Sequence, residues 1–346
     1  MKINGRTIGP GHSTYIIAEM SANHGQDFER AREIIHAMKE SGADAVKLQT
    51  YTPDTITIDA DTEYFKIGKG TIWEGKNLYA LYGEAYTPWD WQPKLKEEAS
   101  ALGMDLFSTP FDNSAVDFLE AMNVPAYKVA SFELVDLALI EYIARKGKPI
   151  IMSTGMGSKE EISDAVETVR KAGNDQLVLL KCTSAYPSPP EEMNLKTIPD
   201  MAKTFGVPVG LSDHTLGTAV PIAAVALGAC VVEKHFTLNR REPGPDSAFS
   251  LEPHEFKAMV DAVRTTEKAL GGVSYEVTPK EEASRVFRRS LFIVEDMKKG
   301  EEFTSKNLRS IRPGNGLLPK YLSDVLGKKS AKAIQRGTPL SWELVV

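Results

Sequence analysis

Short apolar segments recur along most of the chain, and amphipathic segments separate them. Residues 28–39 and 159–171 place apolar side chains at helical spacing, so each predicts a helix that packs by one face. Eight segments have the length and β-branched composition of strands: 15–20, 45–50, 106–111, 126–131, 149–155, 177–184, 208–213 and 230–236. Eight strand–helix repeats predict a parallel (β/α)8 TIM barrel over residues 1–272.

An open doubly wound sheet is the alternative fold, but the count of eight strands favours closure into a barrel. No glycine-rich dinucleotide motif follows the first strand, which weakens the open sheet further. Residues 51–86 are too long for a plain loop and predict a rim insertion with its own short helix. Its aromatic residues, including Trp73, either pack the insertion or form part of a lid.

Each predicted strand begins apolar and ends polar, as in IIAEM, VKLQT, YKVAS and VEKHF. The carboxyl ends of barrel strands lie at one end of the barrel, where TIM-barrel active sites are found. A single buried charge could belong to a structural ion pair, whereas eight strands that end alike indicate a site. We therefore expect these residues to converge: Glu19, Lys47, Gln49, Thr109, Lys128, Ser131, Ser153, Thr154, Ser184, Ser212, His214, Glu233 and His235.

Composition and charge exclude several classes of protein. No apolar run approaches the roughly 18 residues of a membrane span, and the first residues lack the apolar segment of a signal peptide. The two cysteines, Cys182 and Cys230, lie in apolar runs, which is typical of reduced thiols in the cytoplasm.

Charge is distributed unevenly along the chain. Residues 285–346 hold 13 Lys+Arg and 6 Asp+Glu, whereas the whole chain has a net charge of −6. An acidic body with a basic tail argues against nucleic-acid binding. The tail either docks on the body or brings cations to an anionic ligand.

His214 and His235 end consecutive strands, so their imidazoles can meet at the barrel end. With carboxylates nearby from Glu19, Glu233 and Asp246, two imidazoles suit a divalent metal with open positions. The alternative is a pair of core histidines with satisfied hydrogen bonds. Mixed nitrogen and oxygen ligands suit Mn²⁺, Co²⁺ or Zn²⁺, and Mg²⁺ if waters complete the shell; residue types alone do not choose among these ions.

Lys47 and Lys128 end two other strands and lie among predicted hydroxyl groups of Thr109, Ser131 and Ser153. Two ammonium groups with hydroxyls and backbone N–H groups can hold a phosphate and a carboxylate together. A lysine beside a second cation can instead form a Schiff base, which would make the protein a pyruvate aldolase.

The strand-end motifs AEMSANH, DAVKLQT, FSTPFD, YKVAS, CTSAYP, GLSDHT, EKHFTL and GPDSAFSLEP occur in the order found in the sialic acid synthase family, which the chain resembles. After a linker at 273–286, residues 287–346 resemble the antifreeze-like SAF domain of that family, of the β-clip type. The matching pieces are residues 288–291, 299–300 and 311–316. The resemblance implies an enzyme that couples phosphoenolpyruvate to an open-chain N-acylated hexose and releases phosphate.

Within the family the chain resembles the pseudaminic acid synthases. Ser184 stands where sialic acid synthases commonly have Asn, and Ser247, Ala248 and Phe249 replace a more polar segment. The resemblance implies 2,4-diacetamido-2,4,6-trideoxy-altrose as the substrate, with a mannose-configured amino sugar, as in sialic or legionaminic acid synthases, as the alternative.

The resemblance also implies roles for single residues. Lys47, Thr109, Lys128, Ser131, Ser153 and Ser212 match phosphoenolpyruvate contacts, and His214 and His235 match metal ligands. Glu19, Glu233 and Asp246, with both lysines, match catalytic positions. Arg312 matches an arginine that one subunit lends to the other, which implies a domain-swapped homodimer. The remaining expected substrate contacts are Asn23, Gln49, Ser184, Tyr186 and Phe249.

Three other functions stay open at this point. A Schiff-base aldolase would use free pyruvate, and a non-catalytic barrel would bind glycan through its tail. A related keto-acid synthase acting on a phosphorylated aldose would need cations near the far end of the sugar, for which Arg240 and Arg241 are the candidates.

Overall fold

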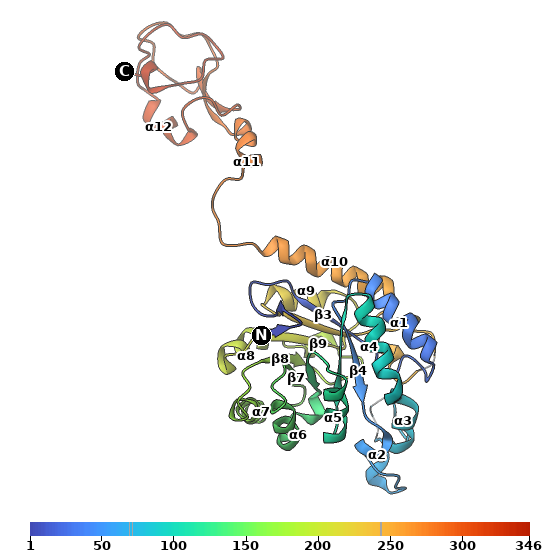
Figure 1. Ribbon diagram of the computed structural model, residues 1–346. Coiled ribbons are helices and arrows are strands. Elements are labelled where there is room, and N and C mark those ends of the chain that lie inside the picture. The colour runs from blue at the N-terminus through green and yellow to red at the C-terminus, as the bar shows by residue number, and fades with distance from the viewer. Residues whose placement is uncertain (69, 71, 243) are drawn as a thin grey trace. The chain divides into compact units, whose positions relative to one another are not determined.

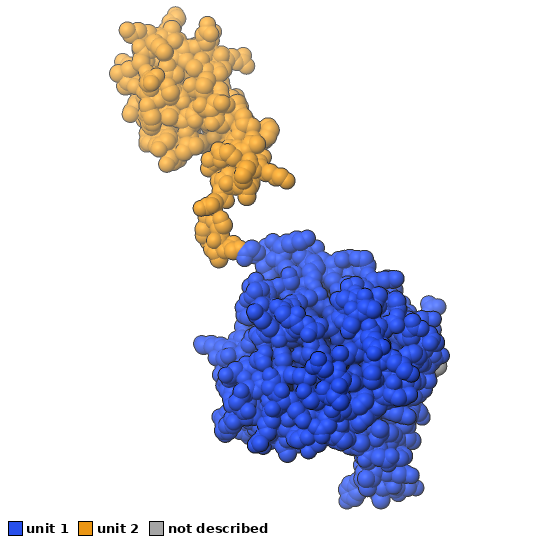
Figure 2. Space-filling view, viewed as in Figure 1, with its two compact units in different colours: residues 1–271 blue, residues 272–346 orange. Residues whose placement is uncertain are grey.

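The computed structural model describes residues 1–68, 70, 72–242 and 244–346. The chain divides into two compact units, Met1–Gly271 and Gly272–Val346, which Figure 2 shows in blue and orange. Within the described residues, no helix has both the length and the apolar composition that crossing a membrane requires. The predicted linker at 273–286 falls in the second unit and contains a short helix, α11 (Pro279–Ser284).

Eight parallel strands of the first unit close into a barrel, so the predicted (β/α)8 fold is confirmed. The last strand pairs with the first, with His235 beside Glu19 and Val231 beside Tyr15. Six of the eight strands are one to three residues shorter than predicted. Polar residues at their ends leave the ladder; Ser131, for example, begins a 3₁₀ turn. The strands are β3 (Tyr15–Glu19), β4 (Ala45–Thr50), β5 (Asp105–Pro110), β6 (Tyr127–Val129), β7 (Ile150–Ser153), β8 (Leu177–Cys182), β9 (Val209–Asp213) and β10 (Val231–His235).

Helices cover the outside of the barrel (Figure 1). The two helices predicted from periodicity are present as α1 (Phe28–Glu40) and α7 (Lys159–Lys171). Both begin at a side-chain cap: Asp27 accepts from the Arg30 backbone, and Ser158 forms a capping box with Glu161. The other covering helices are α4 (Gln92–Ala101), α5 (Asn113–Ala121), α6 (Leu137–Ala144), α8 (Thr197–Phe205), α9 (Ala219–Ala226) and α10 (Pro253–Leu270).

The opposite, amino-terminal end of the strands is associated with a hairpin of β1 (Lys2–Ile3) and β2 (Arg6–Thr7). Its Ile3 is fully buried, and Asn4 donates to Asp105 at the start of β5. The predicted insertion after β4 contains α2 (Pro53–Ile56), a 3₁₀ turn at Glu63–Phe65 and α3 (Leu78–Ala85), while its residues 69 and 71 lie outside the described part. Because the insertion follows β4, it begins at the carboxyl end of that strand, whereas the hairpin lies at the amino-terminal end of the barrel.

The second unit has its own small core around Leu291, Phe303 and Val325. Its strands β11 (Ser290–Ile293) and β12 (Leu308–Ile311) pair in antiparallel fashion, and a short helix α12 (Leu322–Val325) follows. A side chain at Gly316 would collide with the Leu291 carbonyl, so this close approach of two backbone segments requires glycine.

A buried ion pair joins β9 to β10 on the side of the strands that faces the helices. Lys234 Nζ lies 2.5 Å from Asp213 Oδ2, and both side chains are 0% exposed. Lys234 also donates to the Thr215 carbonyl, while Asp213 accepts from the Thr215 backbone N–H. The pair therefore holds the start of the loop after β9 in place. Its two residues directly precede the predicted site residues His214 and His235 in the chain.

We predict that Lys234→Met destabilises the protein by about 3–5 kcal/mol, because it leaves the Asp213 carboxylate buried without its cation. Urea denaturation measures the loss. The double variant with Asp213→Asn removes the orphaned charge and is expected to recover much of the stability. Equal stability of the single and double variants would show that the ion pair does not carry the effect.

Candidate active site

Four charged side chains, one from each of four strand ends, meet inside the barrel. Lys47 Nζ lies 2.7 Å from Glu233 Oε1 and 3.2 Å from Glu19 Oε2, and Lys128 Nζ lies 3.9 Å from Glu233 Oε1. The register of the ladder explains the approach, because Glu19 pairs with Lys47 on one side and with His235 on the other. The structure thus brings together both predicted lysines and two of the predicted carboxylates.

The two carboxylates differ sharply in proton affinity. Burial alone would raise the pKa of Glu233, but the charges of Lys128 and Lys47 outweigh it and lower this pKa to about 2. Burial raises the pKa of Glu19 to about 7, with the Glu233 charge adding to the effect and Lys47 opposing it. Near neutral pH, Glu233 is therefore ionised while Glu19 can hold or release a proton. Two carboxyl groups with separated pKa values are typical of an acid–base site.

Hydroxyl groups surround Lys128, whose pKa burial lowers to about 8. Its Nζ donates to Ser153 Oγ at 2.6 Å, and Ser131 Oγ accepts from the backbone N–H of Gly155 at 3.0 Å. A side chain at Gly155 would collide with the Ser131 and Ser184 hydroxyls, so the turn after β7 needs glycine to bring them together. The predicted Thr109 is buried at the end of β5, and Ser212 Oγ donates to Glu233 Oε1 at 3.2 Å. Thr154 instead donates to the Leu180 carbonyl.

The two predicted imidazoles lie side by side, with the ring centroids of His214 and His235 5.3 Å apart. Nδ1 of His214 lies 3.1 Å from the Thr183 carbonyl, which can only accept, so Nδ1 carries a proton and Nε2 has the lone pair when the ring is neutral. Burial would lower the pKa of His214, but the contacts with Cys182 and the Thr183 carbonyl outweigh it and raise this pKa. Burial and the neighbouring cations hold the pKa of His235 well below its usual range, so this ring is neutral. Tyr186 and Phe249 pack against the pair, with Tyr186 4.4 Å from His214 and Phe249 4.8 Å from His235.

The donor set fits a metal in part. Neutral imidazoles with free lone pairs are the form that binds divalent ions, and His235 Nδ1 is buried without a hydrogen-bond partner. Among the described residues, however, no three His, Cys, Asp or Glu side chains are arranged to hold a metal ion. Asp246 accepts from Ser21, and Glu233 is paired with Lys47. The protein would thus supply two imidazoles, and substrate or water oxygens would have to complete the shell.

Two of the predicted substrate contacts, Asn23 and Gln49, form hydrogen bonds to other protein groups. Asn23 donates to the Phe236 carbonyl and to Ser250 Oγ, so its amide nitrogen ties two loops together. Gln49 donates to Glu19 Oε1 at 3.0 Å and to Ser21 Oγ at 3.1 Å, which places it within the charged cluster. Arg312 is an exposed residue of the second unit, just after β12.

Three residues of the site lie outside the predicted set. Ser21 connects Gln49 with Asp246, and Glu133 has a buried Oε2 without a partner and a pKa that burial raises to about 7. Cys182, predicted only as a buried thiol, has its Sγ 3.9 Å from His214 Nδ1. Ser21 and Glu133 lie two residues or more beyond the last residue of their strands, and counting strand ends alone misses them.

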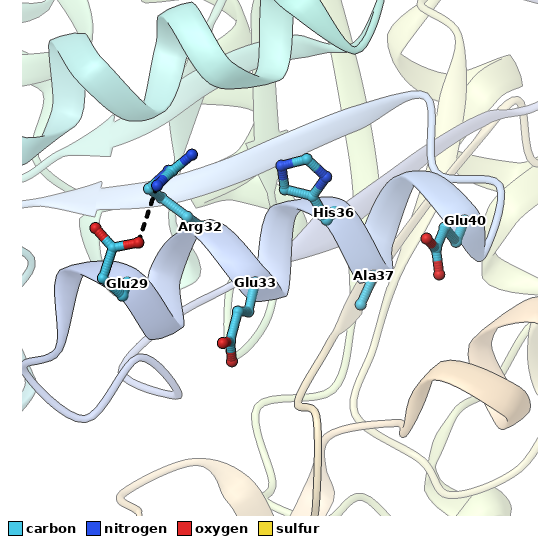
Figure 3. Close-up of a pocket in the computed structure, with 6 residues that line it drawn as sticks. All are labelled: Glu29, Arg32, Glu33, His36, Ala37 and Glu40. Carbon is cyan, nitrogen blue, oxygen red and sulfur yellow. Dashed lines mark hydrogen bonds and ion pairs between the residues drawn. The ribbon is translucent and has the colours of Figure 1, made fainter.

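Two surface hollows lie away from this cluster. One, of about 360 Å³, follows the outer face of α1 (Figure 3), where Arg32 and His36 bind Glu98 of α4. It holds none of the predicted site residues; its lining is Glu29, Arg32, Glu33, His36, Ala37 and Glu40. The other, of about 530 Å³, is lined by Asn239, Arg240, Arg241 and Glu252. The Arg240 guanidinium forms an ion pair with Glu255 and donates to the Ser250 carbonyl, so protein groups already occupy it. The chemistry of the strand ends, rather than the size of these hollows, identifies the site.

Known proteins resemble the chain over its whole length. Residues 34–275 match the NeuB family, and residues 288–346 match the SAF domain. The pseudaminic acid synthase of Helicobacter pylori is 48% identical over 94% of this chain and 96% of that protein. The N,N'-diacetyllegionaminic acid synthase of Legionella pneumophila is 38% identical over 99% of the chain and 98% of that protein.

Solved structures agree with these matches. The Bacillus subtilis spore coat polysaccharide biosynthesis protein SpsE has a TM-score of 0.69 and 32% identity, covering 100% of this chain and 99% of that one. The sialic acid synthetase of Leptospira borgpetersenii, solved with citrate, has a TM-score of 0.73 and 29% identity over 82% of this chain and 94% of that one. The expected SAF domain is thereby confirmed at residues 288–346. The chain belongs to the NeuB family.

Proposed function

We propose that this enzyme condenses phosphoenolpyruvate with open-chain 2,4-diacetamido-2,4,6-trideoxy-altrose to give pseudaminic acid and phosphate. The observation that carries the proposal is the cluster itself, in which two buried lysines and several hydroxyls lie beside two imidazoles and a protonatable carboxyl. Relatives named pseudaminic acid synthases are 47–48% identical, whereas those named N,N'-diacetyllegionaminic acid synthases are 36–38% identical. A mannose-configured amino sugar is the alternative substrate.

In the proposed reaction, C3 of phosphoenolpyruvate bonds to the aldehyde carbon, water adds to C2, and the C2–O bond to phosphate breaks. Lys47 and Lys128 neutralise the carboxylate and phosphate of phosphoenolpyruvate. The Ser131, Ser153 and Ser212 hydroxyls position these anionic groups. Glu233 stays ionised and stabilises positive charge that develops at C2, while Glu19 has the pKa to deliver or accept a proton.

His214 and His235 would hold a divalent ion, with Mn²⁺ expected and Co²⁺ or Mg²⁺ as alternatives. When bound, such an ion supplies Lewis-acid polarisation of the aldehyde carbonyl. The free Nε2 of His214 and the unpartnered Nδ1 of His235 support this assignment. Tyr186 and Phe249 pack on both rings and limit the access of water to them.

Isotopic labelling tests the proposed bond cleavage. Phosphoenolpyruvate carrying ¹⁸O at the bridging position is expected to deliver its label to the released phosphate. Label that remains in the sugar acid would refute the mechanism. A Schiff-base aldolase would instead be trapped on Lys47 or Lys128 by borohydride in the presence of pyruvate, because only that reaction forms an imine.

We also propose a domain-swapped homodimer in which Arg312 of one chain completes the barrel end of the other. The exposed Arg312 has no ion-pair partner in the part of the chain that the structure describes, and the second unit as a whole is basic. If the site is shared, Arg312→Ala is expected to raise the KM for substrate and lower kcat.

Complementation tests the sharing directly. Arg312→Ala and Lys47→Met chains, each nearly inactive alone, are mixed and allowed to exchange subunits. Half of the resulting dimers then contain one intact site, so about a quarter of wild-type activity is expected to return. No recovery in a mixture shown to contain mixed dimers would place each site within a single chain.

A further inference from the structure

The side chain of Trp73 joins three loops at the carboxyl end of the barrel. It belongs to the insertion after β4, and its Nε1 donates to the Pro245 carbonyl, in the loop after β10, at 2.9 Å. Its ring packs on Tyr186, in the loop after β8, with ring centroids 5.6 Å apart and tilted by 57°. Trp73 itself is only half-buried, so it is not part of the barrel core. The Trp73 indole therefore connects the insertion to the loops after β8 and β10.

The contacts of Trp73 continue inward to the imidazole pair. Tyr186 packs on Phe249 at 5.1 Å and on His214 at 4.4 Å, and Phe249 packs on His235 at 4.8 Å. Trp73 is thus the outermost member of an aromatic row that begins at His214 and His235. Rings in such a row present apolar faces, and a carbohydrate packs its C–H groups against faces of this kind.

The aromatic row is long enough for a six-carbon sugar chain to lie along it. Two steps of 4.4 and 5.6 Å separate His214 from Trp73. An extended six-carbon chain, with C–C bonds of about 1.5 Å, spans about 6 Å. With the aldehyde carbon beside the imidazoles, as the proposed function requires, a chain extended along the row would place its sixth carbon toward Trp73.

We infer that Trp73 forms the wall of the sugar subsite at the sixth carbon and selects a 6-deoxy amino sugar over its 6-hydroxylated counterpart. This inference rests on the proposed function and deepens it. The indole has one polar atom, a donor, and Pro245 already accepts from it. A methyl group packs against the ring face, whereas a hydroxyl placed there is desolvated without a partner.

Apolar pockets reject an added hydroxyl by about 10- to 100-fold. The test compares kcat/KM for phosphate release with two sugars, 2,4-diacetamido-2,4,6-trideoxy-altrose and the same sugar carrying a C6 hydroxyl. In Trp73→Ala the preference of the wild-type enzyme for the 6-deoxy sugar is expected to fall at least about tenfold, while the KM for phosphoenolpyruvate stays unchanged.

Two further variants separate the contributions of the side chain. Trp73→Phe keeps an apolar ring without the donor to Pro245 and is expected to retain most of the preference. Tyr64→Ala is the matched control, because Tyr64 is an aromatic residue of the same insertion with 92% exposure, and it should leave both sugars unaffected. Should Trp73→Ala not fold, Trp73→Leu provides the same ratio with a smaller loss of volume.

An unchanged sugar preference in Trp73→Ala or Trp73→Leu overturns the inference and leaves the proposed function standing. A wild-type enzyme that releases no phosphate with any amino sugar refutes the proposed function, and this failure is seen before any variant is made. If only mannose-configured sugars react, the same comparison is made with that pair of 6-deoxy and 6-hydroxy sugars. Loss of the preference in that pair supports the role of Trp73, and its retention overturns it.

Discussion

Replacing Lys47 by methionine is expected to lower kcat/KM for phosphoenolpyruvate by about 10²- to 10³-fold. Methionine has a similar length but no charge, so one of the two cations that would neutralise the substrate anions is lost. The same change leaves Glu19 and Glu233 buried without their nearest cation, which is expected to cost about 3–5 kcal/mol of stability. Phosphate release measures the first effect, and urea denaturation measures the second.

Lys181→Met is the matched control for this variant. Lys181 lies on the neighbouring strand β8, is half-buried, and donates to the Cys182 carbonyl and to Thr183 Oγ1. Within the described residues it has no carboxylate partner, so its loss should leave the KM for phosphoenolpyruvate unchanged. A Lys47→Met enzyme with the wild-type KM, or equal losses in both variants, would remove Lys47 from the anion site.

Removal of divalent metal by a chelator is expected to lower the rate of phosphate release by more than about 10³-fold, because Lewis-acid stabilisation is worth several kcal/mol. Added Mn²⁺ should restore the wild-type enzyme and fail to restore His235→Ala. The physical reason is that His235 is one of only two imidazoles at the site and is held neutral by its surroundings. Calorimetric titration with Mn²⁺ gives a second readout that does not depend on activity.

His254→Ala serves as the control for the metal experiment. His254 lies in the first turn of α10, with its side chain 77% exposed, and it is not among the site residues. This variant should bind Mn²⁺ and release phosphate as the wild type does. Full activity of chelator-treated wild-type protein, or unaltered Mn²⁺ binding by His235→Ala, would contradict the proposed metal site.

The barrel and the identity of its polar strand ends could be predicted from sequence because both follow from local periodicity. In Ala45–Thr50, for example, six consecutive residues are enough to predict both the strand and the polar residues at its end. Closure of eight such strands then places Lys47, Lys128 and His235 at the same end of the barrel, whatever the details of packing. The order of the motifs also identified the family, which the matches over residues 34–275 and 288–346 establish.

Hydrogen-bond partners in the site could not be predicted in the same way. Asn23 belongs to a strand-end motif, yet its amide nitrogen binds the Phe236 carbonyl and Ser250, more than 200 residues away in the chain. Trp73 is one of several aromatic residues in the insertion, and only its contacts with Pro245 and Tyr186 distinguish it from the exposed Tyr64. Partners so distant in sequence leave no local pattern.

The sequence by itself determined which kinds of side chain stand at the strand ends, because strand period and chain order are local properties. Only the tertiary structure decided that Glu233 has a pKa of about 2 while Glu19 has one of about 7. The physical reason is that proton affinity depends on the exclusion of water and on charges a few ångströms away. Those charges come from strands far apart in the chain, and folding alone sets their distances.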